Sequence, residues 1–105
     1  MIPNNLSVFM DRLLPATEKS SVKWQEGAAG GAYFCSHKEV NLYISYWYDP
    51  DREMGMYTFR IVKEGGDASF IVTDREDGFM FMKNLYSAVE LNAGNFGTIA
   101  DDFFS

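Results

Sequence analysis

The chain is poor in the side chains that build covalent and metal-bound sites. Its 105 residues include one cysteine, Cys35, and one histidine, His37. A single cysteine cannot form a disulfide within the chain, so the disulfide frameworks of small secreted proteins are excluded. One histidine and one cysteine also fall short of the usual nitrogen and sulfur ligands of a zinc site. We therefore expect no metal and no cofactor.

Basic residues and long apolar runs are also scarce. Nine Lys and Arg residues face 15 Asp and Glu residues, which gives a net charge of −6. Such a surface repels phosphate backbones and anionic lipid headgroups, so we expect neither a nucleic-acid nor a membrane partner. No stretch approaches the roughly 20 apolar residues that span a bilayer. The first ten residues lack the basic and apolar regions of a signal peptide, so we predict a cytoplasmic protein.

Known catalytic motifs are missing as well. There is no glycine-rich phosphate loop, no Gly-x-Ser-x-Gly and no His-Glu-x-x-His. The segment that begins at Asp49 resembles the start of a calcium loop. However, its sixth position is Met54 instead of glycine and its twelfth is Arg60 instead of glutamate. A solvated β-turn is the better interpretation.

Cys35 and His37 are two residues apart and would share one face of a strand. A thiolate and an imidazolium at that spacing resemble a nucleophile and its base, but the reaction also needs an orienting group and an oxyanion hole. The alternative makes Cys35 a small hydrophobic residue of a sheet and His37 part of a turn. We predict a protein without catalytic residues, and a Cys35/His37 hydrolase is the remaining catalytic alternative.

What the chain does have is apolar and aromatic side chains, at 47% and 16% of its residues. This content is ample for the core of one domain over residues 1–105. Residues 6–14 carry an apolar stripe at helical spacing, and Pro15 is expected to end or kink that helix. A second stripe runs over residues 81–92, with an N-cap expected within 74–77 and a left-handed cap at Gly94. Residues 95–105 form a tail in which a short helix is an alternative.

Between these helices the apolar pattern changes to a period of two. It predicts five strands, which are separated by turn signals: residues 22–25, 32–36, 40–48, 56–62 and 68–73. A run of hairpins flanked by helices indicates an α+β fold. We expect a five-stranded antiparallel sheet with the N-terminal and C-terminal helices packed on one face.

Two exposed regions are candidates for binding. Tyr43 and Trp47 lie on the side of the third strand that faces away from its continuous apolar face, near the acidic residues Asp49, Asp51 and Glu53. We rank packing within the chain first for the two aromatic residues and partner binding a close second. Stacking on nucleic-acid bases ranks last, because the basic residues that such a surface needs are missing nearby.

The second candidate region is in the tail. Asp101, Asp102, Phe103 and Phe104 combine charge and bulk. Such a segment docks either on its own domain or in a groove of a partner, and we expect the former.

Two segments resemble a loosely defined class of short bacterial and phage proteins whose function is open. One is Leu13-Leu14-Pro15-Ala16-Thr17 followed by Val22-Lys23-Trp24, and the other is Leu85-Tyr86-Ser87-Ala88-Val89 leading to Asn92. The resemblance implies the same order of helix, hairpin sheet and helix, and a bacterial or phage origin. Pro15 departs from the continuous first helix of that class. A second resemblance is to small acidic dimeric secretion chaperones, which place a helix between groups of strands. The only candidate for such a helix here is 51–54.

Besides the Cys35/His37 hydrolase, these observations lead to three functional hypotheses without catalysis. The first is an interaction module, such as a small regulator, inhibitor or immunity-type protein, that binds a partner protein. The partner is either basic or of unspecified charge, and a homodimer is a further alternative. The second is a pocket for a small molecule or peptide, lined by Trp24, Tyr46, Tyr48 and Phe81. The third is an acidic dimer of the secretion-chaperone kind.

Overall fold

A computed structural model of the chain describes residues 1–105. Its elements follow in the order α1 (Asn4–Glu18), β1 (Trp24–Glu26), β2 (Ala32–His37), β3 (Val40–Asp49), β4 (Met54–Lys63), β5 (Gly66–Thr73), α2 (Phe79–Ala93) and α3 (Phe96–Phe104). The strands form one antiparallel sheet in the order β1-β2-β3-β4-β5, so each strand pairs with its neighbour in sequence. The predicted α+β fold is confirmed.

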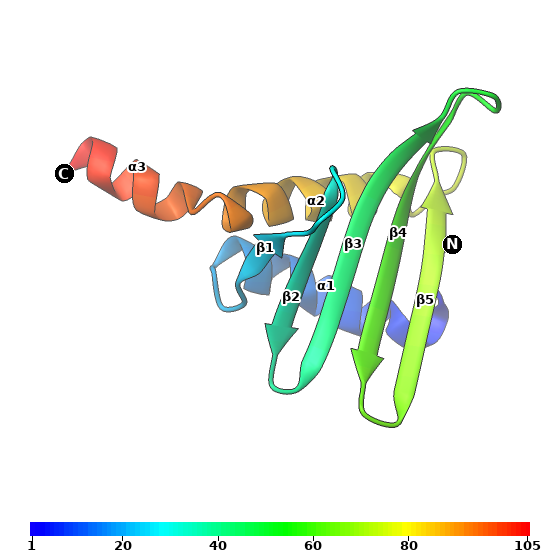
Figure 1. The fold of residues 1–105 in the computed structure, drawn as a ribbon, viewed down its shortest axis with the longest axis horizontal. Coiled ribbons are helices and arrows are strands. Elements are labelled where there is room, and N and C mark those ends of the chain that lie inside the picture. Colours follow the sequence, from blue (N-terminus) through cyan, green and yellow to red (C-terminus); the bar gives the residue numbers. More distant parts are fainter.

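The helices α1 and α2 lie side by side behind the sheet, and α3 extends away from it beyond β1 (Figure 1). The other face of the sheet carries no helix (Figure 1). None of the three helices combines the length and the apolar character that a bilayer crossing requires.

The core fills the space between the sheet and the two helices. Its strand positions alternate as predicted: Leu42 and Ile44 of β3 are buried, and Phe59 and Phe70 are buried beside them on β4 and β5. From α2, Met82, Leu85 and Val89 are buried at helical spacing against this layer. The apolar residues that the sequence places on one face of the helices and on one face of the strands therefore pack together in one core.

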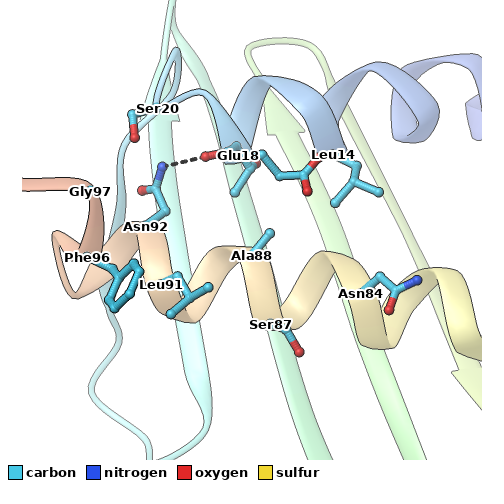
Figure 2. Close-up of a pocket in the computed structure, with 11 residues that line it drawn as sticks. Leu14, Glu18, Ser20, Asn84, Ser87, Ala88, Leu91, Asn92, Phe96 and Gly97 are labelled. Carbon is cyan, nitrogen blue, oxygen red and sulfur yellow. Dashed lines mark hydrogen bonds between the residues drawn. The ribbon is translucent and has the colours of Figure 1, made fainter. Parts of the chain in front are cut away.

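One polar side chain joins the helices and the edge of the sheet. The side chain of Asn92, on α2, is buried; its Oδ1 accepts a hydrogen bond from the Trp24 backbone N–H at 2.7 Å. Its Nδ2 donates to the carbonyl oxygens of Thr17 at 3.0 Å and of Val22 at 2.8 Å. Figure 2 shows Asn92 reaching from α2 toward the end of α1. Three backbone groups of the α1–β1 connection thus find their partners on a single residue.

The side chain of Trp24 also stabilises the contact between the α1–β1 connection and the end of α2. This side chain is fully buried, and its indole Nε1–H donates to the Thr17 hydroxyl at 3.1 Å. Lys23 donates through Nζ to the backbone oxygen of Asn92 at 2.5 Å and also to the side chain of Asn95. The end of α1, the start of β1 and the end of α2 are therefore held together by hydrogen bonds and by apolar packing.

Of the two outcomes predicted for Pro15, an end or a kink of the first helix, the end does not occur. α1 continues through it to Glu18, and the Pro15 carbonyl oxygen accepts from Lys19 N at 2.9 Å. Leu13 and Thr17, on either side of Pro15, are both buried. Packing of the buried stripe against the rest of the domain therefore offsets the helical hydrogen bond that Pro15 cannot donate. The local sequence pattern does not contain this long-range contribution.

The predicted N-cap of the second helix is wrong, whereas the helix does end at Gly94, as predicted, but without the left-handed conformation. The residue before α2 is Gly78, and no side chain caps the helix. Asp74 instead accepts from Gly55 N at 3.0 Å, and Glu76 accepts from Thr73 N at 3.0 Å, so both carboxylates stabilise the loop. At the other end the left-handed residue is Asn95, at φ 57°, and not Gly94, at φ −82°. Asn tolerates this conformation better than most residues.

We predict that Asn92→Leu lowers the free energy of unfolding by about 2–4 kcal/mol, because buried backbone groups lose their partners. Asn84→Leu is the matched control, since Asn84 lies on the same helix and is exposed. Denaturant unfolding of the three proteins measures the difference. Equal losses in the two variants would contradict the assigned role of Asn92.

Candidate functional site

The helix-free face of the sheet gathers large apolar side chains. We call it the open face and define it by Phe34, Tyr43, Trp47, Thr58 and Ile71, which point away from the helices because strand residues alternate between faces. Tyr43, Trp47 and Ile71 are 42%, 49% and 50% exposed. No element of the chain covers them.

Cross-strand pairing sets the positions of these side chains. Phe34 on β2 is the direct partner of Tyr43 on β3, and the next residue across, on β4, is Arg60. Trp47 is opposite Met56, which is only 6% exposed although it lies on the same face. Directly opposed side chains shield one another, so Met56 forms the buried floor beside a protruding indole.

A hollow of about 410 Å³ lies on this face, beside the connection between β1 and β2. Gly27 and Ala28 line one side, Phe34 and Tyr43 the other, and Thr58 and Arg60 are also part of the wall. The hollow thus offers aromatic side chains and one guanidinium.

The charge on the open face is locally paired. The Arg60 guanidinium donates to the Asp67 carboxylate, with Nη2 to Oδ2 at 2.6 Å and Nε to Oδ1 at 3.2 Å. The hydrogen bond to Arg60 holds the pKa of Asp67 below its usual value. Both side chains are about half exposed, so this pair orients the guanidinium beside Tyr43 and adds little stability.

The predicted acidic residues lie at one end of β3 and β4, in the turn that joins them. Asp49 Oδ1 accepts from Asp51 N at 3.0 Å, and Arg52 Nε lies 3.7 Å from Asp49 Oδ2, so Asp49 is used by the turn itself. Asp51 and Glu53 are exposed. The turn contains no helix, which corrects the placement of a helix at 51–54 in the secretion-chaperone comparison.

The tail residues lie elsewhere. Phe103 and Phe104 are 78% and 83% exposed on α3, so the expected docking of the tail on its own domain is wrong. Asp101 and Asp102 lie on the same helix and are exposed. The structure therefore does not bring the two predicted interaction regions together: Tyr43 and Trp47 are on the sheet, and the tail extends past β1 (Figure 1).

Cys35 and His37 share the face of β2 that is turned toward the helices, as their spacing predicted, but their surroundings differ. Cys35 is 1% exposed in the core, whereas His37 is exposed at the end of the strand. Burial raises the pKa of the Cys35 thiol, which disfavours the thiolate that a nucleophile requires. No group of three or more His, Cys, Asp or Glu side chains is arranged to hold a metal ion.

Aromatic rings fill the region where a small-molecule pocket was an alternative. Trp24 is buried in the core, and Tyr46 packs on Tyr57 with ring centroids 4.8 Å apart. Tyr57 in turn lies 5.3 Å from Tyr86, whose hydroxyl donates to the Gly31 carbonyl oxygen at 2.7 Å. Tyr48 is exposed beyond this cluster. Tyr46, Tyr57 and Tyr86 therefore pack against one another, and Phe81 is partly buried against the core. None of the three main pockets of the structure is lined by Trp24, Tyr46, Tyr48 or Phe81.

Sequence reasoning missed Phe34, Ile71 and Arg60 as parts of the open face. The signal was present, because Phe34 alternates with Cys35 and Ile71 with Phe70 and Val72. The strand register that makes them neighbours of Tyr43 and Thr58 is set by the connections between strands, and these neighbours cannot be read from each strand alone.

Comparisons of the chain with models of known protein families, with curated proteins and with solved structures find no match.

We predict that the tyrosine cluster makes the fold sensitive to alkali. Burial, with a smaller contribution from Glu90, raises the pKa of Tyr86 to about 12, and burial likewise raises the pKa values of Tyr33 and Tyr57. An unfolded tyrosine ionises near pH 10, so this stability is complete below about pH 10 and is lost as the pH rises through about 12.

Urea unfolding across this pH range, with absorbance titration of the phenols, measures the effect. Tyr86→Phe is expected to be less stable at neutral pH, because it lacks the hydrogen bond to Gly31, but to lose less stability between about pH 10 and about pH 12. The same alkaline slope in both proteins would contradict the assignment.

Proposed function

We propose that the chain is a non-catalytic interaction module that binds a partner protein through its open face. The observation that carries the proposal is the exposure of Tyr43 and Trp47 on a sheet face that no part of the chain covers. Tyr and Trp are enriched among the residues that dominate binding energy at protein interfaces. Small regulators, inhibitors and immunity-type proteins act in this way, by occupying a surface of another protein.

The geometry of the open face favours an anchored contact. Trp47 projects beside the buried Met56, and the hollow next to Tyr43 can accept one side chain of the partner. Since the sheet is held from behind by the helices, the aromatic side chains stand on a rigid support, which lowers the entropy lost on binding. Arg60, oriented by Asp67, is placed to receive a carbonyl or carboxylate of the partner at the wall of the hollow.

Acidic residues at the edge of the open face favour a partner protein with a basic surface. Asp51 and Glu53 are exposed at the end of the open face near Trp47, and the chain as a whole carries −6. Such charges mainly raise the rate of association with a basic surface and disfavour acidic ones. A cytoplasmic setting and a bacterial or phage origin belong to this proposal.

We predict that Trp47→Ser weakens binding of the partner by about 10- to 100-fold, as expected for an interface anchor. Met80→Ser is the matched control, since Met80 is an exposed hydrophobic residue on α2, away from the sheet. The immobilised full chain first captures binding proteins at low and moderate salt. Titration of each captured protein against the wild type and both variants then gives the affinities.

Two outcomes would contradict the proposal. One is that no stable partner is recovered at either salt concentration. The other is a partner that binds the wild type and Trp47→Ser with equal affinity, because the open face would then lie outside the interface.

A further inference from the structure

The helix α3 has an apolar stripe that is mostly exposed. Its large side chains recur at i, i+3, i+7 and i+8, and the exposed fractions of Phe96, Ile99, Phe103 and Phe104 are 53%, 57%, 78% and 83%. Asp101 and Asp102 lie on the two sides of the helix away from the stripe, and the helix carries no basic residue. α3 is therefore an acidic amphipathic helix without a partner in its own chain.

A groove of about 580 Å³ on the opposite flank of α1 has the complementary character. It lies between α1 and the ends of β2 and β3, and most of its lining is apolar: Val8, Phe9, Leu13, Val22, Val40 and Leu42. Every charged or titratable residue in the lining is basic, namely Arg12, His37 and Lys38. No acidic residue lines this groove, although the chain has a net charge of −6.

The neighbouring groove between α1 and α2 is a poorer match for α3. Figure 2 shows that it is bordered by Phe96 and Gly97 at the start of α3 itself, so α3 forms one of its walls. The only charged residue in its lining is Glu18, which would repel Asp101 and Asp102. The two grooves are similar in size, but only the groove with basic lining residues is complementary in charge to α3.

We infer that the chain forms a symmetric dimer in which α3 of each copy lies in the basic, apolar groove of the other, formed by α1 and the β2–β3 hairpin. The stripe of α3 meets the apolar walls, and Arg12 and Lys38 at the rim reach toward the acidic flanks of the helix. This contact does not use the open face, so it goes beyond the proposed function.

The area available explains why the contact is expected to be reciprocal. The four exposed side chains of α3 can bury about 500 Å² in total, since a buried aromatic side chain covers about 150–250 Å². A stable interface buries about 800 Å² per partner, so one inserted helix is too small and two reciprocal insertions reach that size. A two-fold axis also closes the assembly, whereas repeated one-way insertion would produce a chain of copies.

Sedimentation equilibrium of the full chain tests this inference with two variants and a control. The tail variant Phe103→Ser/Phe104→Ser removes the two most exposed of the four stripe residues, and the groove variant Val8→Glu/Arg12→Glu changes the groove at exposed positions. Both variants are therefore expected to fold. Met80→Ser is the control, because Met80 belongs to neither surface.

The wild type and Met80→Ser are expected to dimerise with a Kd of about 1–10 µM, which rises a few-fold between about 0.05 M and about 0.5 M salt. Each double variant is expected to be monomeric alone. A mixture of the two is expected to form a heterodimer, weaker by about 100-fold or more, because one intact α3 meets one intact groove.

Any of three results would overturn the inference. The wild type could be monomeric up to several hundred micromolar, as it would be if α3 stayed free or occupied its own groove. The double variants could dimerise as well as the wild type. Finally, a dimer that is lost in Trp47→Ser but kept in both double variants would place the interface on the open face; this outcome is also distinct from failure of the proposed function.

Discussion

The buried amide of Asn92 joins the end of α2 to the connection between α1 and β1. It satisfies the Trp24 N–H and the carbonyl oxygens of Thr17 and Val22, and thereby fixes the end of α2 against the α1–β1 connection. With this joint in place, both long helices lie on the same side of a five-stranded sheet (Figure 1). An antiparallel sheet can leave one face to solvent, and here that face carries aromatic residues where polar ones are usual.

This one-sided architecture accounts for the two surfaces that are left without a partner. The helix layer covers the apolar rows of the sheet, so Tyr43, Trp47 and Ile71 on the reverse side have nothing in the chain to pack on. The same layer ends at Gly94 and Asn95, where the left-handed residue turns the chain and starts α3 away from the sheet. Large exposed apolar areas on a small domain generally mark interaction sites, and these two lie on different sides of the molecule.

Much of this architecture could be predicted from the sequence, because it rests on periodicity. The alternation over Val40–Asp49 and the helical stripe that includes Met82, Leu85 and Val89 are strong local patterns, and the helix and strand assignments follow from them. The exposure of Tyr43 and Trp47 is also implicit in the alternation, although packing within the chain was the first interpretation. The predicted caps of the second helix failed at Asp74 and in the conformation of Gly94, where short-range signals compete with tertiary contacts.

The rest could not be predicted, for physical reasons that differ from site to site. The passage of α1 through Pro15 depends on the burial of Leu13 and Thr17 against α2 and the sheet, which is a long-range effect. The role of Asn92 depends on backbone groups about 70 residues away in sequence. The groove beside Arg12, His37 and Lys38 is assembled from a helix and a hairpin, so no segment of the sequence contains it.

The most direct test of the account is whether the open face is solvated in the free protein. The chain has two tryptophans, of which Trp24 is fully buried and Trp47 is 49% exposed. Acrylamide quenching of the wild type and of Trp47→Phe separates their emission. A solvated open face gives a readily quenched, long-wavelength component in the wild type, which disappears in Trp47→Phe and leaves only the protected emission of Trp24. A Trp47 component that is protected from acrylamide would instead show that the open face is covered in the free protein.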